Sequence, residues 1–182
     1  MDADLRQRML AYYDERAHEY DEAYTLGTGT ASIADPEVFK TEARVLSGIV
    51  GQVAHGRIMD LACGTAYWLS DYASNCSRTV LVGFLLSHVT DAQEPLLFDA
   101  VRTLLDSSGR FLILDSAWSS ERAKFNARVE RQPRRLNDGT AFEIYKRYCD
   151  RGDISRWSRD YGVRLNIEHF GPAFYAVSGA FG

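Results

Sequence analysis

Short, largely apolar runs alternate with longer amphipathic segments in the middle of the chain. The runs are Arg57–Cys63, Thr79–Leu86 and Arg110–Asp115. A strand that is covered on both faces of a parallel sheet is apolar along most of its length. These runs therefore predict three buried strands.

Apolar residues at helical spacing predict the elements between and before these strands. We expect helices at residues 5–24, 36–50, 66–73 and 91–105. The second of them has a clear start, with Asp35 as the N-cap and Pro36 in the first turn. Alternation of strands and helices is typical of a layered α/β domain.

The last third of the chain has a different pattern. Asn137-Asp138-Gly139 predicts a tight turn between the two arms of a β-hairpin. Gly171-Pro172 separates two further expected strands, so the sheet should end in antiparallel strands. The expected elements are hairpin arms at residues 134–136 and 140–147, a helix at 153–161, and strands at 164–170 and 173–180.

The composition is that of an ordinary globular domain. The chain has 182 residues, of which 46% are hydrophobic and 25% charged, with a net charge of −4. Proteins that bind nucleic acid usually carry a basic excess, so we expect no nucleic-acid partner. We interpret the one compact basic run, Arg128, Arg131, Arg134 and Arg135, as a solvated helix end and loop.

The N-terminus and the cysteines predict a cytoplasmic location without a metal site. Residues 1–10 are charged and lack the apolar core of a secretory signal. No apolar run is long enough to span a bilayer. Cys63, Cys76 and Cys149 share no metal-ligand spacing, and their odd number does not indicate a disulfide framework.

The segment from Ile58 to Ala66 carries the most informative pattern. A strand runs through Asp60 into a turn of small residues, and a helix is expected to follow. Small residues let main-chain N–H groups approach a ligand closely, and a helix N-terminus favours negative charge. The complete G-x-G-x-x-G pattern of dinucleotide-binding folds is absent, so a dinucleotide site is only weakly indicated.

The sequence DLACGTA in this segment resembles the first motif of class I S-adenosylmethionine-dependent methyltransferases. In that family the small-residue turn meets the methionine part of S-adenosylmethionine. Ala66 stands where the family has its last motif glycine. The resemblance implies that the cofactor contacts Asp60, Ala62, Cys63, Gly64, Thr65 and Ala66.

Four other segments resemble the same family, in the expected order along most of the chain. YYDERAHEYD at residues 12–21 is similar to the helix that closes over the cofactor, which implies that Tyr13 and Tyr20 lie against its methionine end. Residues 84–89 resemble the end of the fourth strand, beside the point of methyl transfer. The strand at residues 108–115 and the hairpin around Asn137 resemble later elements of a bacterial small-molecule branch.

Ser87 and His88 are the candidate residues nearest the chemistry. By the resemblance Ser87 contacts the cofactor, and His88 is the candidate general base because an unperturbed imidazole titrates near neutral pH. Ser87-His88 can equally be a capped strand end with a hydrogen-bonded histidine. On similar grounds the tyrosine helix can be a packing helix, and Cys63 a small hydrophobe.

The family's second and third strands have no counterpart here. Only a short segment separates Ala66 from Thr79, where the family has an insert of roughly 45–50 residues. That insert supplies an acidic residue to the ribose and a contact to the adenine. Without it the first strand becomes an exposed edge, and we expect two copies of the chain to associate along that edge.

The fold expected from these patterns is a Rossmann-like methyltransferase sheet, mostly parallel, truncated at one edge and ending in antiparallel strands. A helical cap at residues 1–50 precedes the domain at residues 51–182. The implied function is transfer of a methyl group from S-adenosylmethionine to an oxygen, nitrogen or carbon of a small organic molecule. The alternative is a catalytically degenerate methyltransferase fold that serves as a binding or assembly module.

Overall fold

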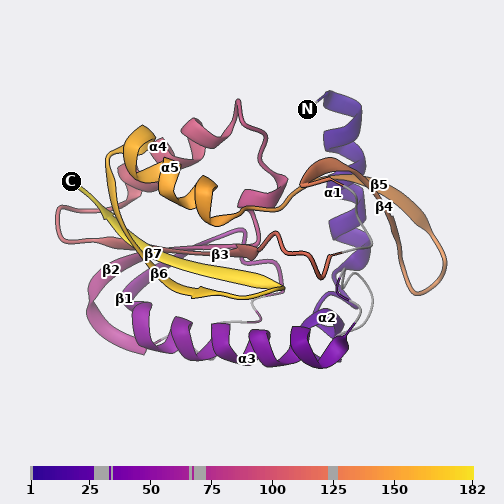
Figure 1. The fold of residues 1–182 in the computed structure, drawn as a ribbon, viewed down its shortest axis with the longest axis horizontal. Helices are drawn as coiled ribbons and strands as arrows, with labels where there is room; N and C mark the ends of the chain where they lie inside the picture. Colours follow the sequence, from indigo (N-terminus) through magenta and orange to yellow (C-terminus); the bar gives the residue numbers. More distant parts are fainter. Residues whose placement is uncertain (1, 27–32, 34, 66, 68–72, 123–126) are drawn as a thin grey trace.

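A five-stranded sheet forms the centre of the protein in the computed structural model, which describes residues 2–26, 33, 35–65, 67, 73–122 and 127–182 (Figure 1). The strand order is β1-β2-β3-β7-β6. The first three strands are parallel to one another, and the last two run antiparallel to their neighbours. The strands are β1 (His55–Leu61), β2 (Ala73–Gly83), β3 (Arg110–Ser116), β6 (Val163–Phe170) and β7 (Phe174–Phe181). This confirms the expected Rossmann-like sheet with an antiparallel end.

Helices cover both faces of the sheet (Figure 1). Helix α3 (Pro36–Val53) lies on one face, and α4 (Glu94–Leu104) and α5 (Arg151–Tyr161) lie on the other. Alternate residues of β2 point to opposite faces, so that Leu81 packs in the cluster with α3 while Val80 packs in the cluster with α4 and α5. Burial on both sides explains why the central strands are apolar throughout.

The ends of two helices follow from local side-chain bonds. The Asp35 carboxylate accepts the Glu37 N–H at 2.9 Å, and Pro36 occupies the first turn of α3, which confirms the predicted start. Helix α5 begins with a capping box of Asp150 and Asp153, two residues earlier than predicted. It ends at Gly162, which has a positive φ of 62°.

A helix and a hairpin stand together at one end of the sheet (Figure 1). Helix α1 (Ala3–Arg16) packs against the two-stranded hairpin of β4 (Val129–Arg135) and β5 (Ala141–Arg147). A small apolar cluster holds them together, and its buried members are Leu5, Met9, Tyr12, Leu136 and Ile144. Short helix α2 (Glu22–Thr25) leads from α1 towards α3.

The single helix predicted at residues 5–24 is wrong. Helix α1 ends at Arg16, and a turn separates it from α2. Tertiary contacts outweigh helical periodicity here, because the Glu19 carboxylate accepts the Asn137 N–H and the Asp21 carboxylate accepts the Thr65 hydroxyl. The segment is therefore shaped by the hairpin turn and by the loop after β1.

The interpretation of Arg128, Arg131, Arg134 and Arg135 as a helix end and loop is also wrong. Three of the four lie in strand β4, where successive side chains alternate between the two faces. Arg134 is buried, whereas Arg135 is exposed. Because side chains alternate between the two faces of a strand, the adjacent residues Arg134 and Arg135 differ in burial.

The predicted strand at residues 79–86 ends three residues early. Strand β2 stops at Gly83 because Phe84 has a positive φ of 54°, and Leu86–His88 forms a 3-10 turn. The helix predicted at residues 66–73 falls almost entirely outside the described residues, and Ala73 begins β2. In the described part of the chain, β1 pairs with β2 alone and stands at the edge of the sheet.

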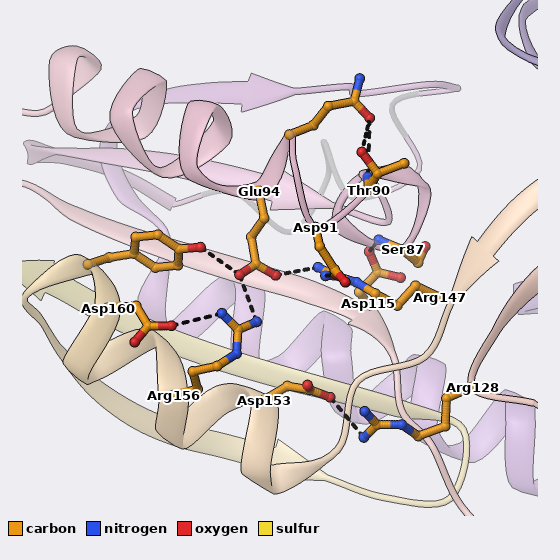
Figure 2. A network of polar contacts seen from close by, with 12 residues as sticks. Ser87, Thr90, Asp91, Glu94, Asp115, Arg128, Arg147, Asp153, Arg156 and Asp160 are labelled. Carbon is orange, nitrogen blue, oxygen red and sulfur yellow. Dashed lines mark hydrogen bonds and ion pairs between the residues drawn. The ribbon is translucent and has the colours of Figure 1, made fainter. Parts of the chain in front are cut away.

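A polar network fastens the hairpin to the helical layer (Figure 2). The buried Glu94 carboxylate at the start of α4 accepts hydrogen bonds from Arg147 of β5, Arg156 of α5 and Tyr161. Burial alone would raise the pKa of Glu94, but the hydrogen bond from Tyr161 and the charge of Arg147 lower it overall. The carboxylate is thus charged and holds three elements in place. None of the helices in the described ranges has the length and apolar character that a bilayer crossing requires.

Candidate ligand-binding site

A cleft of about 580 Å³ lies between α1 and the carboxyl ends of β1 and β2. Ligands of open α/β sheets bind outside the carboxyl ends of parallel strands, and a volume of this size suits a small organic molecule. Tyr13 and Tyr20 line it from the N-terminal segment, and Phe84 and His88 from the segment after β2. Its other lining residues include Arg6, Met9, Leu10, Asp14, Ala17, Ala62, Gly64, Thr65, Gly83 and Leu85.

The main chain takes a rare conformation directly after both strands. Ala62 follows β1 with a φ of 65°, and Phe84 follows β2 with a φ of 54°. They are the only non-glycine residues with positive φ in the described part of the chain, and both line the cleft. Such conformations cost energy and cluster at ligand sites. The floor of the cleft is therefore formed by two turns with a strained main-chain conformation.

Gly64 leaves the cleft open above the first of these turns. It is exposed, has a φ of 52°, and a β-carbon placed on it would meet nothing closer than the Ala62 carbonyl oxygen at 4.0 Å. The main chain is thus accessible from the cleft at this position.

Most of the predicted cofactor residues are brought together here. Asp60 and Cys63 line a small recess that joins the cleft at Gly64 and Tyr20, and Cys63 is an exposed free thiol instead of a packed side chain. Thr65 donates a hydrogen bond of 2.5 Å to the Asp21 carboxylate, which ties the motif turn to the N-terminal segment. Ala66 lies outside the described residues.

His88 is held in one tautomer by its two hydrogen bonds. Its Nδ1 lies 2.8 Å from the Tyr145 carbonyl oxygen, which can only accept, so Nδ1 carries the proton. Nε2 lies 2.6 Å from the Tyr13 hydroxyl and accepts from it. Burial, reinforced by the charge of Lys146, lowers the pKa of His88 well below its usual value. The imidazole is neutral at physiological pH and is a weaker base than the sequence led us to expect.

Ser87 is the predicted site residue that lies apart from the cleft. It is buried, its N–H donates to Asp115 at 2.8 Å, and its hydroxyl accepts from Lys146 Nζ at 2.6 Å. It lines neither the cleft nor the recess. Its bonds instead fix the turn that presents His88.

A second, smaller cavity of about 60 Å³ adjoins the cleft. Tyr13, Tyr20, Phe84 and His88 line both spaces and so form the boundary between them. Beyond this boundary the cavity is lined by four basic side chains, Arg16, Arg122, Arg134 and Lys146, each less than a tenth exposed. None of its described lining residues is acidic.

None of these four basic residues was expected to line a site, although two of them have a visible signal in the sequence. Lys146 lies in the alternating series Phe142, Ile144, Lys146 and Tyr148, where a cation interrupts an otherwise apolar face. Arg134 shares a strand face with the fully buried Gln132. Arg16 and Arg122 have no comparable pattern, because the tertiary fold alone brings them to the cavity. No group of three or more potential metal-ligating side chains occurs among the described residues.

Solved structures with this fold are known, although no protein-family model and no curated protein sequence matches the chain. A complex of DhpI with SAM and HEP shares 18% identity over 99% of both chains, with a TM-score of 0.74. The PH0226 protein from Pyrococcus horikoshii OT3 shares 14% identity over 88% of this chain and 97% of its own, with a TM-score of 0.57.

A SAM-dependent methyltransferase from Bacteroides fragilis, in complex with S-adenosyl-L-homocysteine, is more distant. It shares 16% identity over 75% of this chain and 76% of its own, with a TM-score of 0.51. Together with the sheet order and the cleft at the ends of β1 and β2, these similarities establish that the chain has the Rossmann-like fold of SAM-dependent methyltransferases.

Proposed function

We propose that the chain is a methyltransferase that uses S-adenosylmethionine and acts on a small organic molecule. The observation that carries this proposal is the cleft in which the small-residue turn after β1 faces Tyr13 and Tyr20. The open position at Gly64 and the cleft volume of about 580 Å³ fit an extended ligand with an amino-acid tail. The fold supports the same proposal, since two of the similar structures contain SAM or S-adenosyl-L-homocysteine.

The residues divide into two sets in this proposal. Ala62, Gly64 and Thr65 would hold the amino-acid end of S-adenosylmethionine through their main chain, with Asp60 and Cys63 in the adjoining recess. When bound, S-adenosylmethionine supplies a methyl group on a positively charged sulfonium sulfur. Tyr13 and Tyr20 present aromatic rings at the boundary with the second cavity, and an aromatic ring face attracts a cation.

The protein contributes chiefly by orientation and by exclusion of water. Holding acceptor and donor in one enclosed place supplies much of the acceleration of a displacement reaction. His88 has both ring nitrogens engaged, with Tyr13 as the donor to Nε2. It therefore positions the Tyr13 hydroxyl, and it can act as a base only when that bond is broken.

Calorimetric titration with S-adenosylmethionine and S-adenosylhomocysteine tests the proposal. We expect one site per chain, and we expect Gly64→Asp to abolish binding because the new carboxylate would enter the cleft. Gly139→Asp is the matched control, since Gly139 also has positive φ and open space but lies in the hairpin turn. Equal affinity of wild type and Gly64→Asp would refute the site assignment.

The edge position of β1 favours a second candidate function. The described residues show no strand beyond β1. A methyltransferase fold without catalysis could use this edge for assembly. Specific binding at its weakest has dissociation constants in the millimolar range. If neither S-adenosylmethionine nor S-adenosylhomocysteine gives heat or a thermal shift at millimolar concentration, this candidate is favoured.

We further infer that two copies of the chain pair along β1, because an unpaired edge presents free N–H and C=O groups. The half-exposed Met59 on this strand adds apolar area to such a contact. Light scattering after size exclusion should give the mass of a dimer at micromolar concentration. A monodisperse monomer would exclude this association, without bearing on cofactor binding.

A further inference from the structure

The second cavity concentrates positive charge in a space that solvent barely reaches. Its four basic residues have exposed fractions of 7% for Arg16, 2% for Arg122, and 8% for both Arg134 and Lys146. Asp115, which accepts the Ser87 N–H, lies 3.8 Å from Lys146 and offsets part of this charge. The buried Glu42 acts on Arg122 in the same direction. His88 is neutral and none of the described lining residues is acidic, so the charged side chains that line the cavity are all cations.

Several of these side chains are fixed in position by neutral groups. Arg122 donates hydrogen bonds to the carbonyl oxygens of Ala117 and Ala173, and its guanidinium lies 4.4 Å from the centre of the Tyr148 ring. Arg134 donates to the Gln132 side chain at 2.6 Å. The Arg16 guanidinium lies 4.6 Å from the centre of the Tyr20 ring. These contacts fix the positions of three of the four cations that line the cavity.

Buried like charges destabilise one another unless an opposite charge is close. Burial lowers the pKa of Lys146, and the neighbouring arginines lower it further, although Asp115 opposes them. Burial likewise lowers the pKa of Arg122, to about 10. An anion in the cavity would relieve this repulsion, and guanidinium groups match the planar geometry of oxyanions. The arrangement is therefore complementary to an anionic ligand group.

We propose that the second cavity binds the acid group of a small organic oxyanion, and that an oxygen of this group accepts the methyl. This inference rests on the proposed methyltransferase function and names its substrate class. The cavity has about one tenth of the volume of the cleft, so it holds an acid group and little more. Tyr13, Tyr20, Phe84 and His88 at the boundary would be the point at which acceptor and donor meet.

The proposed class of acceptor also fits the weak base at the boundary. An ionised oxygen already carries the electron pair that forms the new O–C bond, and the pair of the broken S–C bond stays on sulfur. The acid group thus loses one negative charge when its oxygen becomes an ester oxygen, the sulfonium becomes a neutral thioether, and no proton has to leave. His88, with Nε2 engaged by Tyr13, is not required to remove one.

Adjacent arginines on β4 provide a matched pair of variants. Arg134→Gln and Arg135→Gln each remove one positive charge, but only Arg134 lines the cavity, while Arg135 is exposed and donates to the Gly139 carbonyl oxygen. The probes are methylphosphonate and acetate, titrated by calorimetry into the protein with and without S-adenosylhomocysteine. Acetamide serves as the neutral control for acetate.

We expect one or both anions to bind, acetamide not to bind, and Arg134→Gln to weaken anion binding by about tenfold or more while Arg135→Gln leaves it unchanged. The anion that binds more tightly identifies the acid as a phosphonate or a carboxylate. Lys146→Gln should reproduce the loss, which gives a second reading if Arg134→Gln does not fold. S-adenosylhomocysteine affinity should stay within about twofold in these variants, because none of the three residues lines the cleft.

Two results would overturn the proposal. One is that neither anion binds at roughly 10 mM in protein that binds S-adenosylhomocysteine. This concentration is far above the dissociation constants of specific recognition. The other is an equal loss in Arg134→Gln and Arg135→Gln, which would indicate only general charge attraction. If S-adenosylhomocysteine does not bind but the anions do, the methyltransferase function fails while the anion site stands.

Discussion

Ala62 and Phe84 concentrate conformational strain at the two strand ends that form the floor of the cleft. For a residue with a β-carbon, the left-handed conformation is roughly 1–2 kcal/mol higher in free energy than the right-handed one. Both residues keep this conformation in a turn that faces a ligand-sized space. At this scale the site is built into the main chain, and side-chain identity matters less than backbone shape.

Ala62→Gly should therefore raise the free energy of unfolding slightly or leave it unchanged, because glycine adopts positive φ without the steric cost. The same substitution at Ala100, which is exposed in the interior of α4, should lower it by about 1 kcal/mol. Urea denaturation of both variants measures the contrast. A similar loss at the two positions would show that Ala62 is not strained.

His88 gives the fold a defined dependence on pH. Its pKa is lowered in the folded protein, so below the ordinary value of 6.5 the unfolded chain binds a proton that the folded chain does not. Stability should then fall as the pH drops from about 6.5 towards the folded pKa, by up to about 1.4 kcal/mol per pH unit. Denaturation of wild type and His88→Gln between pH 5 and 7 should show a flatter slope in the variant. Parallel slopes would contradict the assignment of a neutral, buried imidazole.

At the scale of elements, the hairpin of β4 and β5 supplies two of the four basic residues of the cavity. Its position depends on Arg147, which follows Lys146 and binds the buried Glu94 of α4 at 2.6 Å (Figure 2). Arg156 of α5 binds the same carboxylate, and also the exposed Asp160. One buried carboxylate therefore fixes how the hairpin meets the helical layer.

Glu94→Gln should cost about 2–4 kcal/mol of unfolding free energy, because it leaves the buried Arg147 with only the exposed Asp91 as a charged partner. Asp160→Asn removes the other carboxylate of Arg156 at an exposed site and should cost less than about 0.5 kcal/mol. Thermal or chemical denaturation compares the two variants directly. The lowered pKa of Glu94 means that its contribution is present above pH 4.5 and is lost as the pH falls through the folded value. Equal costs for the two variants would show that Glu94 does not act as a clamp.

At the scale of the whole molecule, the sheet could be predicted because its strands carry their own pattern. Continuous apolar runs gave β2 and β3, the Asn137-Asp138-Gly139 turn gave the hairpin, and the motif turn gave the position of the cleft. The second cavity could not be predicted, because its basic residues come from four separate segments that only the tertiary fold brings together. The break after Arg16 was missed for the same reason, since contacts with Asn137 and Thr65 decide it.

Cys63 offers the most direct measurement of the central claim, that the turn after β1 holds the cofactor's amino-acid end. This thiol is exposed in the recess beside Gly64, whereas Cys149 is buried, and burial raises the pKa of Cys149 to about 12. Alkylation of each cysteine can be followed by mass spectrometry as S-adenosylhomocysteine is added. We predict that Cys63 becomes protected in proportion to ligand binding, while Cys149 stays unreactive throughout. Unchanged alkylation of Cys63 at saturating S-adenosylhomocysteine would contradict the account.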